Sequence, residues 1–250
     1  MKMKVNLSDE SYWHERYGKL ELRMAPPNNI IRAWIEKYVA RGSGRCLEIG
    51  CFPGRFLAVF GQLGYELNGI DLIPGVEKDL PDWLKSNGFK IGNFRRIDFF
   101  AFQESEKYDI VCSFGFIEHY DHWQDVLLKH ADLVKENGLL LIETPNFSGI
   151  IQKWFHYCLD RENYRRHHIA AMNPRAWRKI LVAHGFAIVH CGYLGSMNFW
   201  VGEQKHGFMA KTILSLIFNV FLPIARRLPI PAGRKSYSPV CAVIARKKPS

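Results

Sequence analysis

Residues 45–57 read RCLEIGCFPGRFL. The run CLEIG (46–50) predicts a buried strand, because it is apolar apart from Glu48. Gly50 and Gly54 predict a tight turn, and the apolar spacing that follows predicts a helix over 55–64. Such a turn aims backbone N–H groups and the positive end of a helix dipole at a ligand. The stretch therefore predicts a ligand-binding loop at the end of the first strand.

Strands and helices alternate along the rest of the chain, which predicts an α/β, doubly wound, mostly parallel sheet with an antiparallel edge hairpin. We expect one domain over 1–250. Two long connections, 146–172 and 195–237, interrupt the alternation and are expected to shape the substrate site or an interface. The expected strands span 46–50, 66–72, 94–98, 108–114, 138–145, 186–194 and 238–247, and the further helices 81–87, 123–137 and 174–185.

The chain of 250 residues carries a formal net charge of +10, which suits nucleic acid, an anionic membrane or an anionic substrate without choosing among them. Its six cysteines include no CxxC pair, so buried free thiols in a reducing compartment are expected. The N-terminal residues have no apolar run, which predicts no secretory leader and favours a cytoplasmic location.

Asp71 supplies a second signal for a nucleotide-type ligand. It lies at the end of the second expected strand, 21 residues after Gly50, where an acidic side chain meets ribose hydroxyls in nucleotide-binding βαβ units. The glycine spacing from Gly50 to Gly54 lacks the G-x-G-x-x-G pattern of dinucleotide loops, and GxxxxGK[ST] is absent as well. What remains is E-x-G-x-x-x-G.

Five motifs in order over about 45–145 resemble the class I S-adenosylmethionine (AdoMet)-dependent methyltransferases, and within them the small-molecule and quinone-type O-methyltransferases. LEIGCFPG resembles the first motif, GIDL the second, RRIDFF the third, YDIVCSFGFIEHY the fourth and LVKENGLLLIETPN the fifth. SYWHERYG (11–18) also resembles the aromatic lead of many members. The resemblance implies that AdoMet is the cofactor, with S-adenosyl-L-homocysteine as product, and that it is surrounded by Glu48, Gly50, Phe52, Gly54, Asp71, Leu72, Asp98, Phe99, Ser113 and Phe114.

Phe52 departs from the family pattern, which has a glycine there. A phenylalanine keeps the loop geometry if its φ is negative, with its ring lying over the cofactor or under the N-terminal segment.

Methyl transfer from AdoMet is an in-line displacement, and a hydroxyl acceptor is helped by a general base. The resemblance implies His119 with Glu118 as catalytic candidates, since an EH pair recurs there in related enzymes. His168 is the second candidate. Related metal-binding enzymes have an acidic residue three positions before the Glu, where this chain has Gly115, so no metal is expected. Tyr157, Tyr164, Arg165 and His168 are expected to shape the acceptor pocket, and the cluster with Arg161 and Arg166 suits an anionic acceptor.

The expected acceptor is a hydroxyl of a small or lipid- or glycan-linked molecule. No NPPY-type tetrapeptide and no Pro-Cys pair is present, which disfavours nucleic-acid bases as acceptors. Two alternatives stay open: a catalytically silent AdoMet-binding partner protein, and an RNA methyltransferase. The oligomeric state is open as well.

The second connection contains AKTILSLIFNVFLPIARRLPIP (210–231). Its apolar part, 212–222, predicts a helix that Pro223 stops or kinks. Eleven residues span about 17 Å, too short to cross about 30 Å of hydrocarbon. The segment 211–227 is therefore expected to cover an apolar substrate site, to pack on the sheet or on another subunit, or to contact a membrane peripherally at its inner face.

Overall fold

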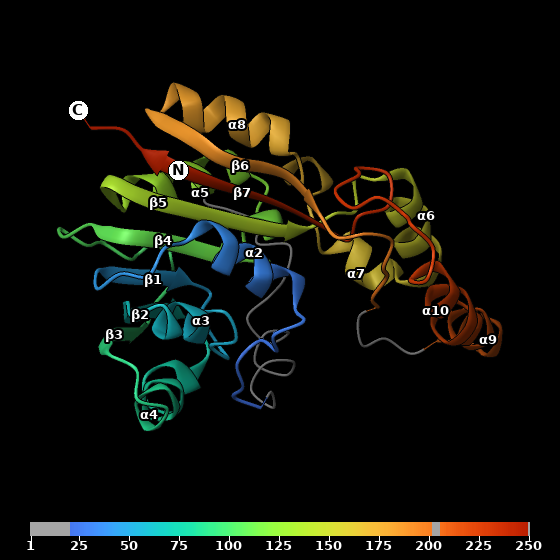
Figure 1. Ribbon diagram of the computed structural model, residues 1–250, viewed down its shortest axis with the longest axis horizontal. Helices are drawn as coiled ribbons and strands as arrows, with labels where there is room; N and C mark the ends of the chain where they lie inside the picture. Colours follow the sequence, from blue (N-terminus) through green and yellow to red (C-terminus); the bar gives the residue numbers. More distant parts are fainter. Residues whose placement is uncertain (1–20, 202–205, 250) are drawn as a thin grey trace.

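The computed structural model describes residues 21–201 and 206–249, so the expected aromatic lead at 11–18 lies outside the described residues. Seven strands form one sheet in the order β3-β2-β1-β4-β5-β7-β6 (Figure 1). The pairings from β3 through β5 are parallel, and β7 runs antiparallel to both β5 and β6, which confirms the expected fold class. The strands are β1 (Arg45–Ile49), β2 (Glu66–Asp71), β3 (Ile91–Arg96), β4 (Tyr108–Phe114), β5 (Val134–Pro145), β6 (Phe186–Leu194) and β7 (Val240–Lys247).

Helices cover both faces of the sheet because successive strand side chains point to opposite faces and both sets are apolar. Leu47 and Ile49 belong to the layer that includes α5 and α8, whereas Cys46 belongs to the layer of α2, α3 and α4. Each layer closes over one face of the sheet and forms half of the core. The helices are α2 (Ile30–Tyr38), α3 (Leu57–Gln62), α4 (Asp79–Ser86), α5 (Trp123–Asp132) and α8 (Pro174–Ala183).

The prediction of a helix over 123–137 is wrong at the C-terminal end. α5 ends at Asp132, and β5 already begins at Val134. The Tyr108 N–H donates to the Leu133 carbonyl at 2.9 Å, and Val134 pairs with Tyr108. Burial of Leu133 and Val134 beside β4 outweighs the helical periodicity, and Asn137, at φ 62°, turns the chain before Gly138.

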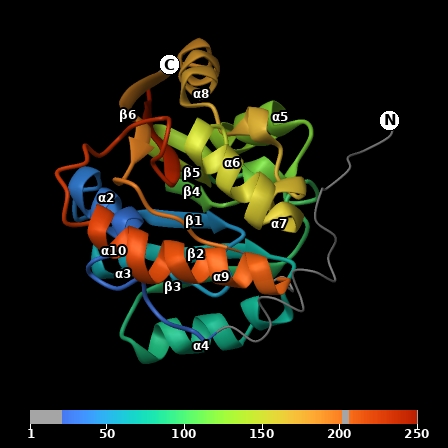
Figure 2. The same ribbon diagram turned by 90° about the vertical axis from the view of Figure 1, so that its right-hand side faces the viewer.

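The two long connections contain helices. The first holds α6 (Ile150–Leu159) and α7 (Arg161–Arg165), and the second holds α9 (Phe208–Leu216) and α10 (Leu222–Ala225). A π-helical turn, Ile217–Phe221, joins α9 to α10. Both connections begin at the carboxyl edge of the sheet, because β6 is parallel to β5. The views in Figures 1 and 2 place their helices together at that end.

The expected helix of 212–222 is too short, and of the two outcomes expected at Pro223 the helix does not stop there. The helical segment runs from Phe208 to Ala225, 18 residues, or about 27 Å at the usual rise. Pro223 has no N–H to donate to the Asn219 carbonyl four residues earlier. The π-helical turn before it, which is wider than an α-helical turn, allows the helix to continue without that hydrogen bond. By length and composition alone, the segment is long and apolar enough to cross a membrane.

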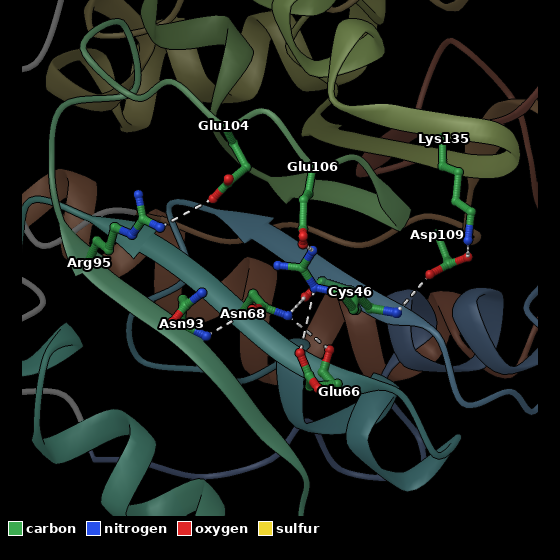
Figure 3. A network of polar contacts seen from close by, with 10 residues as sticks. Cys46, Glu66, Asn68, Asn93, Arg95, Glu104, Glu106, Asp109 and Lys135 are labelled. Carbon is green, nitrogen blue, oxygen red and sulfur yellow. Dashed lines mark hydrogen bonds and ion pairs between the residues drawn. The ribbon is translucent and has the colours of Figure 1, made fainter.

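Ion pairs and hydrogen bonds connect the amino ends of neighbouring strands (Figure 3). Arg45, the first residue of β1, bonds Glu106 at 2.5 Å and approaches Glu66 of β2 at 3.6 Å. Its backbone N–H donates to Asp109, which also pairs with Lys135 at 3.0 Å. These polar groups satisfy one another at the amino edge. The opposite, carboxyl edge carries the loop after β1.

Candidate functional site

The loop after β1 is shaped by its two glycines. Parallel pairing of Ile49 with Ile70 brings the ends of β1 and β2 together, and the Gly50 N–H donates to the Ile70 carbonyl at 2.9 Å. Gly50 has φ +72°, and Gly54 has φ +81°. A Cβ at Gly54 would lie 2.3 Å from Leu80 Cδ1, so the left-handed backbone and the close approach both require glycine there.

Phe52 fits this loop through its backbone. Asn137 is the only non-glycine residue with positive φ in the described part of the chain, so Phe52 satisfies the condition set by the sequence. Its N–H donates to Asp71 Oδ2 at 2.8 Å. Its ring lies against Gly75, where an added Cβ would be 2.6 Å from Phe52 Cε2. The side chain thus packs below the loop after β2, and the loop keeps its tight course.

Asp71 is held by backbone donors on both carboxylate oxygens. Leu72 and Ile73 donate their N–H groups to Oδ1 at 2.7 and 3.1 Å, while Phe52 binds Oδ2. These bonds fix the orientation of the carboxylate in the cavity lining, where its oxygens are hydrogen-bond acceptors. The geometry suits recognition of a vicinal diol such as a ribose.

A cavity of about 310 Å³ opens between the ends of β1, β2 and β4. Its lining includes every predicted cofactor residue except Ser113, whose buried hydroxyl has no hydrogen-bond partner among the described residues. The prediction did not include several lining residues, because no spacing rule singles them out. These are Ile49, Cys51, Pro53, Arg55, Phe56, Ile70, Ile73, Ile97, Gly115, Phe116 and Tyr120, with His119 from the catalytic candidates.

Three acidic residues, Glu48, Asp71 and Asp98, line the cavity. Glu48 is 4 % exposed, and its Oε2 has no hydrogen-bond partner among the described residues. Burial, with the nearby Asp71 charge, raises the pKa of Glu48 well above its usual value, while the Leu57 N–H opposes this. A buried acceptor beside a second carboxylate favours a cationic ligand group, such as an ammonium or a sulfonium.

Asp98 and Phe99 form the far wall. The Asp98 Oδ1 accepts the Phe100 N–H at 2.7 Å, which closes a turn after β3. Phe99 is buried, with its ring edge-on to Phe116 at 5.6 Å. An apolar wall with a fixed carboxylate at its edge is suited to a flat, aminated heterocycle.

His119 lies on a short 3₁₀ turn, Ile117–His119, after β4 and reaches the cavity. Its Nδ1 is 3.1 Å from the Arg166 carbonyl oxygen. Burial above all, then the neighbouring His167, lowers the pKa of His119 well below its usual value. The imidazole is therefore neutral at pH 7, with one protonated nitrogen and one lone pair.

The other two catalytic candidates, Glu118 and His168, are not part of the cavity lining. Glu118 is fully buried, and its carboxyl oxygens have no hydrogen-bond partner among the described residues. Burial raises the pKa of Glu118 well above the usual value. The His168 N–H donates to the Glu118 carbonyl at 2.7 Å. These contacts connect the segment around Arg166 to the turn that carries His119.

The structure also brings His167, which was not among the candidates, next to His119, with ring centroids 4.6 Å apart. One ligand atom each from Glu118, His119 and His167 lies within 4.8 Å of the others. Carboxylate oxygen and imidazole nitrogen are donors that zinc and similar ions accept. The expectation that no metal binds therefore stays a prediction.

The residues expected to shape the acceptor pocket lie in α6, α7 and the following turn, outside the cavity lining. Tyr157 and Tyr164 meet edge to face at 5.8 Å, and Arg161 lies 5.5 Å from the Tyr157 ring. Arg166 pairs with Glu162 at 3.2 Å. Their role toward an acceptor stays a prediction.

A family model described as a methyltransferase domain matches residues 12–191, which is 180 of the 250 residues. The chain belongs to this family. S-adenosyl-L-methionine is accordingly the cofactor of the domain, as the motifs predicted, and its groups fit the diol site at Asp71 and the acidic lining at Glu48.

Curated relatives match a shorter region. Ubiquinone biosynthesis O-methyltransferase of Rickettsia felis is 27% identical over 100 residues, which is 40% of this chain and 41% of the relative. The same-named protein of Burkholderia multivorans is 26% identical over 121 residues, 48% of this chain and 52% of the relative. The chain thus spans about half or less of the length of these relatives.

Solved structures show the same fold. The N-methyltransferase NodS of Bradyrhizobium japonicum, in complex with S-adenosyl-L-homocysteine, has a TM-score of 0.55 at 12% identity, with 97% of this chain and 94% of that chain covered.

Proposed function

We propose that the protein transfers the methyl group of S-adenosyl-L-methionine to a hydroxyl of a small or lipid- or glycan-linked acceptor. The observation that carries this proposal is a neutral, buried His119 in the lining of a cavity whose other walls suit the cofactor. The partial match to enzymes named O-methyltransferases supports the choice of oxygen as acceptor atom.

Different residues of the cavity would contact different parts of the cofactor. Asp71 would accept hydrogen bonds from the ribose hydroxyls, and the Asp98 carboxylate would meet the adenine amino group beside Phe99. Glu48 would face the cationic methionine portion at the loop. The bound cofactor supplies an electrophilic methyl group on a sulfonium.

His119 would take the proton of the acceptor hydroxyl. Its depressed pKa keeps the imidazole neutral at pH 7, as a general base requires, and its place in the cavity lining supports a role next to the acceptor. Glu118 and His168 would act as positioning residues, since the His168 N–H holds the Glu118 backbone next to His119.

The test compares His119→Gln with wild type for release of S-adenosyl-L-homocysteine, using a panel of phenols, sugars and isoprenoid alcohols. We expect a fall in kcat of about 10²–10⁴-fold, with little change in affinity for S-adenosyl-L-homocysteine. His122→Gln is the matched control, because His122 is exposed just before α5 and should keep full activity.

A folded wild type that binds S-adenosyl-L-homocysteine but methylates no hydroxyl would overturn this proposal and favour the silent partner protein. Methylation of amines alone would overturn the choice of acceptor atom.

A further inference from the structure

Exposed apolar side chains gather at one end of the molecule. Among the described residues, the large exposed apolar side chains lie in 150–157 and 208–228, apart from Val182 and Val189. Phe208 is 85% exposed and Trp154 is 61% exposed. We call the set the end surface; it comprises Ile150, Ile151, Trp154, Tyr157, Phe208, Met209, Ile213, Leu216, Val220, Phe221, Ile224 and Leu228.

The helix that carries most of this surface is anchored in its middle and near its end. Leu214 in the middle and Leu222 near the end are buried in a small cluster with Phe155 of α6 and Phe199. Arg226, just after α10, donates to the Asn198 side chain at 3.1 Å. Both flanks then return to the neighbouring strands β6 and β7. The helix therefore has one face packed against the cluster and the other exposed. Figure 2 shows α9 and α10 from the end of the molecule on which they lie.

Positive charge surrounds the end surface. Residues 206–249 contain no Asp or Glu, and their exposed basic side chains include Lys211, Arg226, Arg227, Arg234 and Lys235. Beside α6, Asp160 is buried against His156 at 2.9 Å and Glu162 pairs with Arg166. Of the nearby acidic groups, Asp160 is thus buried and Glu162 is paired with a basic side chain, and the rim of the apolar face is cationic.

We propose that the end surface rests on an anionic phospholipid bilayer, with the helix of residues 208–225 parallel to the membrane plane. An apolar face flanked by Lys and Arg binds at the boundary between headgroups and acyl chains, where the basic side chains meet anionic headgroups. The anchors at Leu214 and Leu222 keep the helix from crossing the bilayer, although its length would permit crossing. The surface lies at the carboxyl edge of the sheet, the edge that also holds the cofactor cavity (Figure 1).

The test is co-sedimentation of the full chain with vesicles of phosphatidylcholine alone and of phosphatidylcholine with phosphatidylglycerol. We expect binding to be at least about tenfold stronger with phosphatidylglycerol and to fall as salt is raised. Lys211→Glu with Arg227→Glu should remove most of the preference for phosphatidylglycerol. Phe208→Ser with Ile213→Ser should remove binding to both vesicles, because exposed apolar contacts are lost.

Matched pairs separate the end surface from general changes of charge and apolarity. Lys85→Glu with Lys90→Glu makes the same charge change on exposed residues in and after α4, and Val182→Ser with Val189→Ser removes exposed apolar groups elsewhere. Both pairs should bind vesicles like wild type. Affinity for S-adenosyl-L-homocysteine should be unchanged in all four variants, which shows that each is folded and separates this test from the proposed catalysis.

Absence of wild-type binding to phosphatidylglycerol vesicles would overturn the proposal. So would equal binding by wild type and Phe208→Ser with Ile213→Ser. A wild-type dimer by light scattering that this variant converts to a monomer, with no vesicle binding, would assign the end surface to a second copy of the chain instead.

Discussion

The backbone N–H of Phe52 donates a hydrogen bond of 2.8 Å to Oδ2 of Asp71, which joins the loop after β1 to the end of β2. The loop contacts Asp71 through its main chain, so the side chain at position 52 is free to be large, provided that Gly75 leaves room for the ring. This explains how a phenylalanine occupies a position where related loops have glycine.

Asp71→Asn should weaken both the loop and the cofactor site. The amide NH₂ group of asparagine would replace one carboxylate oxygen, so it could not accept the N–H of Phe52 or those of Leu72 and Ile73 at that position. One acceptor for the ribose hydroxyls would be lost as well. We expect the affinity for S-adenosyl-L-homocysteine to fall at least about tenfold and the free energy of unfolding to fall by about 1–3 kcal/mol. Titration calorimetry and urea unfolding measure the two effects.

Glu77→Gln is the control for Asp71→Asn, since Glu77 is exposed and outside the cavity lining. Unaltered affinity in Asp71→Asn would contradict the assignment of the diol site.

Gly50→Ala should strain the backbone and push against Phe116. Gly88→Ala is the control, because it strains the backbone in the same way without meeting a neighbouring atom. Both glycines have positive φ, +72° and +79°, so alanine costs about 1 kcal/mol or more at each. A Cβ at Gly50 would also lie 2.9 Å from Phe116 Cδ2, whereas Gly88 has no atom within 4 Å of that position. We expect both variants to lose stability in urea, and Gly50→Ala alone to lose affinity for S-adenosyl-L-homocysteine. Equal affinities would show that Phe116 moves away without consequence.

Glu143 should make stability depend on pH. Burial raises its pKa to about 8 in the folded protein, against 4.5 as the ordinary value. Between these values the folded state holds a proton that the unfolded state has released, so the stability contributed by Glu143 is complete below about pH 4.5 and is lost as pH rises toward 8. Glu143→Gln cannot ionise. Relative to wild type it should gain about 1–3 kcal/mol in free energy of unfolding between pH 5 and pH 8.

Urea unfolding at both pH values measures this gain. Burial lowers the pKa of His130 and His167 to about 4, which reduces stability below pH 6.5, but it does so equally in both proteins and cancels in the comparison. A pH-independent difference between wild type and Glu143→Gln would refute the prediction.

Two leucines of the segment 208–225 should respond differently to truncation. Leu222 is fully buried in the cluster with Phe155, whereas Leu216 is 57% exposed. We expect Leu222→Ala to cost about 2–4 kcal/mol in free energy of unfolding, and Leu216→Ala to stay within about 0.5 kcal/mol of wild type. Similar losses in the two variants would show that the helix packs differently.

The sheet could be predicted because its central strands are buried apolar runs and its strands are separated by turn residues. YDIVCSF (108–114) coincides with β4, and FAIVHCGYL (186–194) coincides with β6. Periodicity failed where a tertiary contact decided the conformation. Val134 has helical spacing from α5 but pairs with Tyr108, and Pro223 lies within a helix because a π-helical turn precedes it.

The cofactor side of the site could be predicted because it is local: a loop, one acidic residue and the ends of adjacent parallel strands. The catalytic side depends on the first long connection, which folds back on the chain. The proximity of His167 to His119 and the contact between His168 and Glu118 join residues about fifty positions apart, and no spacing rule specifies them.

Both long connections leave the sheet at the edge that holds the cofactor cavity. With the end surface on a bilayer, a lipid-linked acceptor would reach this edge by lateral diffusion within one leaflet. The turnover rate would then follow the mole fraction of acceptor in the membrane, and added inert lipid would slow the reaction by surface dilution while the bulk concentration stayed constant.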